Sequence, residues 1–105
     1  MMPSTRLILD EGFSADTLER ISTQCYDDDE LATFPVAVVV LAHITGSIAN
    51  HLSNRPVHTD AFETVKALIE PPVRSLLEAV SVGRRDDVAE RVSTLSDAFL
   101  AWRES

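Results

Sequence analysis

The stretch PVAVVVLAHITGSIANHLSN, residues 35–54, decides the fold class of this chain. Its first half is apolar on every side, which is typical of a segment that other elements surround. A run of β-branched valines also favours a buried strand, so residues 36–41 fit either structure when taken alone. Ile44, Ile48 and Leu52 continue an apolar stripe at i, i+4 and i+8, and this spacing predicts one helix over residues 35–54.

A second row of the same stretch contains only small side chains. Ala42, Gly46, Ala49 and Ser53 follow one another at spacings of 4, 3 and 4 residues. Small side chains in a row let the backbone of another helix approach closely. Close packing would offset the cost of about 1 kcal/mol that a glycine carries inside a helix. The row therefore predicts a tight helix–helix contact.

Four other segments have helical periodicity: residues 15–26, 60–70, 72–82 and 86–103. Ser14 is the expected N-cap of the first, and Phe13 and Leu18 have the spacing of a hydrophobic staple around it. Pro71 and Pro72 are expected to separate residues 60–70 from 72–82 or to kink the helix sharply, because proline removes a backbone donor. Gly83 is the expected C′ residue of the helix that ends near residue 82.

The two ends of the chain complete the predicted fold. Val88, Val92, Leu95, Phe99 and Trp102 form an apolar seam at spacings of 4, 3, 4 and 3. Residues 72–82 and 86–103 are expected to form an antiparallel helical hairpin. Residues 1–13 are expected to be an extended arm, and residues 14–105 a single domain. The fold class is therefore all-α, a bundle of four to five helices.

The overall charge limits the classes of partner. The 105 residues include 9 Lys and Arg against 17 Asp and Glu, a net charge of −8. Nucleic acids and anionic membrane surfaces are disfavoured because both require clustered basic side chains. The longest apolar run, residues 35–42, is about half the length of a membrane span, and no secretory signal is visible. A single cysteine, Cys25, excludes an intrachain disulfide and indicates a reducing cytoplasm.

The sequence shows no pattern for metal binding or catalysis. His43 and His51 are eight residues apart, whereas metal pairs on a helix stand at i and i+3 or i+4, and His58 lies beyond the predicted helix. The acidic run from Asp27 to Glu30 lacks the glycine turn of a calcium loop. Nucleophile and phosphate-loop motifs are absent. No metal, no cofactor and no catalytic residue is expected, and the chain is interpreted as a non-enzyme.

His43, Ser47 and Asn50 form the polar strip of the central helix, at i, i+4 and i+7, and Val36 and Val40 extend this face toward the N-terminus. Polar groups on a core helix need partners. The strip is consistent with a structural hydrogen-bond network, a dimer contact or a reactive histidine.

The segment AHITGS, residues 42–47, resembles the phospho-acceptor helix of histidine-containing phosphotransfer domains, which are four-helix bundles with the motif Ala-His-x-x-Lys-Gly-Ser. The glycine here comes three residues after His43 instead of four, and the lysine that aids phosphate in that family is missing. The resemblance implies a signalling module in which His43 accepts phosphate.

The leading functional hypothesis is a small acidic helical protein that acts by binding proteins, as a regulatory, adaptor or inhibitor-type subunit. It is expected to form a homodimer and to bind a further, unknown protein. Leu7, Ile8, Leu9 and Leu100 are the candidate dimer residues, because they lack evident partners within the chain. The alternatives are the phosphotransfer module and a bundle that binds a small molecule beside His43 and Asn50.

Overall fold

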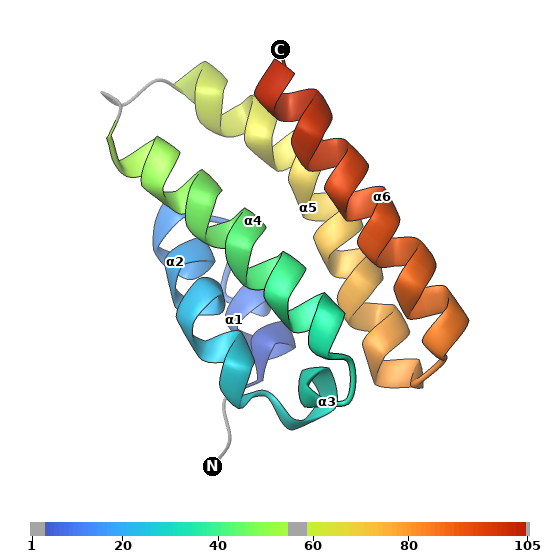
Figure 1. The fold of residues 1–105 in the computed structure, drawn as a ribbon. Helices are drawn as coiled ribbons and strands as arrows, with labels where there is room; N and C mark the ends of the chain where they lie inside the picture. The colour runs from blue at the N-terminus through green and yellow to red at the C-terminus, as the bar shows by residue number, and fades with distance from the viewer. Residues whose placement is uncertain (1–3, 55–58, 105) are drawn as a thin grey trace.

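A computed structural model describes residues 4–54 and 59–104, and side chains are described except at residues 59–61. The described part is all helical (Figure 1). The elements are α1 (Thr5–Asp10), α2 (Ala15–Gln24), a 3-10 turn (Cys25–Asp27), α3 (Asp29–Ala32), α4 (Pro35–Ser53), α5 (Thr59–Val82) and α6 (Arg85–Glu104). The all-α prediction is confirmed, and these residues contain six α-helices instead of the four to five expected.

Helix α4 forms as the apolar periodicity predicts, and its inner side is the centre of the core. Leu41, Ile44 and Ile48 are buried, and α2 is its most extensive neighbour. The row of small residues makes the expected close contact with α2. A Cβ atom added to Gly46 would lie 3.4 Å from the Cβ of Ser22, which is ordinary van der Waals contact. A methyl group would therefore just touch Ser22, and a larger side chain at this position would push the two helices apart.

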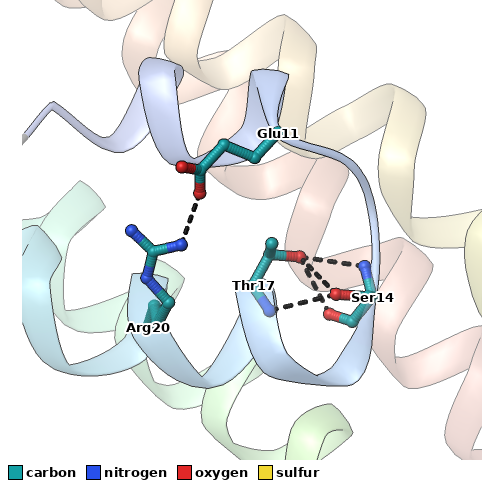
Figure 2. Close-up of polar contacts among 4 residues, drawn as sticks. All are labelled: Glu11, Ser14, Thr17 and Arg20. Carbon is teal, nitrogen blue, oxygen red and sulfur yellow. Dashed lines mark hydrogen bonds and ion pairs between the residues drawn. The ribbon is translucent and has the colours of Figure 1, made fainter.

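Helix α2 begins at the predicted cap. The Ser14 Oγ accepts a hydrogen bond of 3.2 Å from the Thr17 amide, and the Thr17 Oγ1 accepts one of 2.9 Å from the Ser14 amide (Figure 2). This reciprocal pair satisfies backbone donors that the first helical turn leaves unpaired. Arg20 also forms an ion pair with Glu11, which precedes the cap. Phe13 and Leu18 are both buried, as the staple spacing predicts.

The expectation of an extended N-terminal arm is wrong, because residues 5–10 form helix α1. The cause is a single buried side chain. The Asp28 Oδ1 accepts hydrogen bonds from the amides of Glu30 (3.0 Å) and Leu31 (3.2 Å), which caps α3. Its Oδ2 accepts one from the amide of Thr5 (2.9 Å), the first residue of α1. One carboxylate therefore stabilises two helix N-termini, where negative charge is favoured.

The other end of α1 is fixed to α5 through Arg74. Its Nη1 lies 3.6 Å from the Asp10 carboxylate, and its Nη2 donates a 3.5 Å hydrogen bond to the Leu9 carbonyl. These contacts and the Asp28 bond hold α1 so that Ile8 and Leu9 enter the core. A helix of six residues is unstable alone in water, so its formation depends on this docking.

Pro71 and Pro72 do not separate two helices, because both lie inside the continuous helix α5. The other expected outcome, a sharp kink at the prolines, stays a prediction. The reason for the continuous helix is the apolar stripe that runs through the prolines: Val65 and Ile69 before them and Val73 after them are all buried. Packing of this stripe outweighs the donors that the prolines lack. Helix α5 ends at Gly83, as predicted, where a φ of +81° suits glycine. Helix α6 then lies alongside α5 (Figure 1).

We expect Asp28→Ala to lower the free energy of unfolding by about 2 to 4 kcal/mol, because it removes the acceptor of three backbone amides. Urea denaturation measures this change. Asp29→Ala is the matched control, since Asp29 is an exposed neighbour that makes no such bond. An equal loss of stability in both variants would contradict the role given to Asp28.

We expect the double substitution Pro71→Ala and Pro72→Ala to raise the free energy of unfolding by about 1 to 3 kcal/mol, because it restores two backbone donors inside α5. Pro35→Ala is the control, since a proline in the first turn of α4 costs no helical hydrogen bond. Urea denaturation of both variants tests this, and a loss of stability in the double variant would show that the prolines are favourable where they stand.

Candidate functional site

The predicted polar strip lies on the outer side of α4 and not inside a surrounded helix. His43 and Asn50 are exposed and Ser47 is half-buried. Of the two valines expected to extend this face, Val36 is 68% exposed, whereas Val40 is partly buried against the core. Val39, which was not expected on this face, is 60% exposed. The expectation that the first half of this helix is covered on every side is therefore wrong. Val36, Val39, His43, Ser47 and Asn50 are called the outer strip of α4 below.

The outer strip is open because the neighbours of α4 pack elsewhere on the helix. Ala42, Gly46 and Ala49 form the side that meets α2. His43 and His51 mark the side that meets α6, through ring contacts described next. Between these two sides no element in the described ranges covers Val36 or Val39. The packing positions of α2 and α6 thus leave one side of α4 uncovered, and this side carries the apolar side chains of Val36 and Val39.

A row of aromatic rings joins α4 to α6. The His43 and Phe99 rings form a T-shaped pair with a centroid distance of 5.9 Å, and Phe99 stacks on Trp102 at 5.8 Å. Trp102 in turn meets His51 at 4.9 Å. The Arg103 guanidinium carbon lies 5.6 Å from the centroid of Phe99. Such pairs contribute about 0.5–1.5 kcal/mol each beyond their burial, so the row holds His43 beside α6.

The polar members of the outer strip do not form a network with one another. Asn50 Oδ1 accepts a 3.2 Å hydrogen bond from Asn54 Nδ2, one turn further along the chain. Among the described residues, no hydrogen bond joins His43, Ser47 and Asn50. The three side chains are thus separate polar groups on this surface, and Asn50 is the one with a side-chain partner, Asn54.

In the part of the chain that the structure describes, no acidic, basic or nucleophilic side chain forms a hydrogen bond or ion pair with His43. No group of three His, Cys, Asp or Glu side chains is placed there to hold a metal ion. His58, the third histidine of the chain, lies outside the residues that the structure describes. His43 is left as an exposed imidazole whose ring contacts Phe99.

The four predicted interface residues separate into two groups. Ile8 and Leu9 are buried within their own chain, so they are excluded from an interface between folded copies. Leu7 and Leu100 are exposed, Leu100 at 51%, and they lie on α1 and α6. Sequence reasoning did not select Val39, although its spacing of four residues from His43 placed it on the same row. Its apolar character suggested burial, which the packing of α2 and α6 does not provide.

The single cysteine is part of the core. Cys25 is fully buried, and its Sγ lies 3.9 Å from the Val38 carbonyl. Burial raises the pKa of the Cys25 thiol to about 11, and the negative charges of Asp28 and Asp27 act in the same direction. The thiol is therefore protonated at neutral pH. A protonated, enclosed thiol is a poor nucleophile and a poor metal ligand.

Helix α4 is also long and apolar enough to cross a membrane, judged by length and composition alone. Its 19 residues include a window with a mean hydropathy of 1.5, of which 44% is buried inside the structure. The core helix of a bundle has the same properties, so this observation is weak evidence for a membrane span.

Comparison with known proteins found no matching family model, no similar curated protein and no similar solved structure. The functional interpretation therefore rests on the residues of this chain.

Proposed function

We propose that this chain acts by binding another protein through the outer strip of α4, as a regulatory, adaptor or inhibitor-type subunit. The observation that carries the proposal is the exposure of Val36 and Val39 in one row of a helix that has no charged side chain. Single exposed apolar residues are ordinary. Neighbouring ones on an uncharged helix face are typical of surfaces that become covered by a partner.

The proposal places the chain among binding proteins that work in the cytoplasm without a cofactor. Support comes from the character of the site. The outer strip offers apolar contact and a few hydrogen-bonding groups, which suit recognition. Small-molecule sites, by contrast, are concave. His43 and Asn50 are exposed on the convex outer side of a helix, which favours the protein-binding function over the small-molecule alternative.

Self-association remains part of the proposal, with a smaller set of residues than the sequence suggested. Leu7 and Leu100 are the exposed members of that set, and Ile8 and Leu9 are removed from it by burial. A homodimer would form if a second copy covers Leu7 on α1, which is 63% exposed. Its mass would be about twice the 11.6 kDa of one chain.

We expect Val39→Asp to abolish partner binding while the chain stays folded, because the change places a charge in a surface that the partner must desolvate. Val82→Asp is the matched control. Val82 is 62% exposed on α5, so this substitution adds the same charge at a different surface. The measurement is affinity capture from cells that express the protein, with mass spectrometry of the bound chains. Light scattering of the purified protein reports the homodimer. Equal capture by the two variants would contradict an interface on α4.

A second candidate function is the phosphotransfer module with His43 as acceptor, and the exposure of His43 favours it. A histidine must reach its phosphodonor, which a buried one could not do. Against this function, α4 contains no Lys or Arg side chain that could assist phosphate. The Arg103 guanidinium lies over the ring of Phe99, which His43 also contacts.

We expect no phosphate on His43 when the wild type is incubated with phosphorylated response regulators, because α4 provides no cation for the phosphate. Acid-labile radiolabel is the readout, and His43→Gln is the control. A label on the wild type that disappears in His43→Gln would favour the phosphotransfer function over the binding function.

A further inference from the structure

An acidic row runs along the outer side of α6. Asp86, Glu90, Asp97 and Glu104 are exposed and follow one another at spacings of 4, 7 and 7 residues, which keeps them on one side of the helix. In the described ranges none of them forms an ion pair. Leu100 lies three residues after Asp97 and four before Glu104, so it belongs to the same side. These four carboxylates are called the acidic ridge of α6.

The acidic ridge lies beyond Leu100, on the side of α6 opposite its buried residues Val88, Leu95 and Phe99. On α6, Arg91 donates a hydrogen bond to Ser75 of α5 and so marks the side that faces α5. Phe99, which contacts His43, marks the side that faces α4. Leu100 follows Phe99 by one residue, about 100° further around the helix and away from Arg91. The surface therefore passes from the outer strip across Phe99 to Leu100 and then to the ridge.

Acidic side chains also lie at the N-terminal end of the outer strip, next to Val36. Asp29 and Glu30 of α3 are exposed, and α3 packs against α4 just before Val36. Between these acidic groups α4 itself contributes no charge over nineteen residues. Helices α4 and α6 run in the same general direction (Figure 1), so the outer strip and the ridge are parallel, with Phe99 and Leu100 between them.

We infer that the outer strip and the acidic ridge together bind an amphipathic helix of net positive charge from a partner protein. This inference rests on the proposed function and identifies the chemistry of the partner. The apolar side of such a helix would cover Val36, Val39 and Leu100, and its Lys and Arg side chains would reach the ridge. The strip from Val36 to Asn50 is about 21 Å long at 1.5 Å per residue, which fits a partner helix of about four turns.

Charge selects this occupant over a second copy of the chain. Each copy has a net charge of −8, and pairing two outer strips would bring two acidic ridges toward each other. Like charges across an interface disfavour the complex, whereas opposite charges steer a partner and fix its orientation. A basic helix gains both the apolar contact and the charge complementarity. A membrane surface with anionic lipids would be repelled in the same way as a second copy.

The test uses a labelled synthetic probe and fluorescence anisotropy with the full chain. The probe is an 18-residue helical peptide with leucines along one side and lysines on the rest, and a matched peptide has glutamines in place of the lysines. We expect the lysine peptide to bind about tenfold more tightly than the glutamine peptide at 0.15 M salt. The difference should shrink at 0.5 M salt, because screening shortens the reach of surface charge.

Two pairs of variants locate the binding surface. Val39→Asp should weaken the lysine peptide about tenfold although it adds a negative charge, and Val82→Asp should leave its affinity nearly unchanged. The double variant Glu90→Gln and Asp97→Asn should weaken it about fivefold. Its control, Glu63→Gln with Glu78→Gln, removes the same charge from exposed positions on α5. Circular dichroism confirms that each variant remains helical.

Four outcomes would overturn the inference. Equal losses in the two double variants would mean that the peptide senses only the net charge. Unchanged affinity in Val39→Asp would exclude the outer strip. A wild-type dimer that Val39→Asp converts to a monomer would show that a second copy covers the strip. If Val39-dependent capture of a cellular protein persists while the lysine peptide fails to bind, the proposed function stands and the partner is not a cationic helix.

Discussion

Helix α4 has no charged side chain over nineteen residues, and the other helices must remove most of its surface from water. Each large apolar side chain that becomes buried contributes roughly 1.5–3 kcal/mol, and Leu41, Ile44 and Ile48 lie at the centre of the core. The small row on α4 brings α2 close, and the ring contacts of His43 and His51 place α6 on the other side. The arrangement of the bundle follows from covering this one helix.

The short helices around the start of α4 depend on polar contacts more than on their own periodicity. Asp28 caps α3 and receives the first amide of α1, so it links segments 23 residues apart in the chain. Arg74 holds the end of α1 against α5. Because Asp28 is buried, its carboxylate cannot bond to water, and each hydrogen bond from a backbone amide replaces one that water would otherwise donate. The docking of α1 is stabilised by the burial of the apolar side chains of Ile8 and Leu9.

The same packing that covers the inner side of α4 leaves its outer strip open. A chain of 105 residues supplies few helices, and those that meet α4 pack on the sides defined by Gly46 and by the rings of α6. Val36 and Val39 remain at the surface next to an acidic helix. Apolar contact bordered by charge is a property of recognition surfaces. Among the described residues, no group of three His, Cys, Asp or Glu side chains is placed to bind a metal ion, whereas the exposed valines offer a surface for protein binding.

The sequence by itself determined the features that depend on neighbouring residues: the helix from Pro35, the cap at Ser14, the end of α5 at Gly83 and the row around Gly46. Periodicity and capping act within a few residues, so they can be interpreted without a partner. The continuity of α5 through Pro71 and Pro72 was decided by tertiary structure, because distant packing of its stripe outweighs a local preference. The helical state of residues 5–10 likewise depends on Asp28. Periodicity also shows which sides of a helix are apolar but not which of them another helix covers, and therefore only the tertiary structure exposed Val39 and buried Leu9.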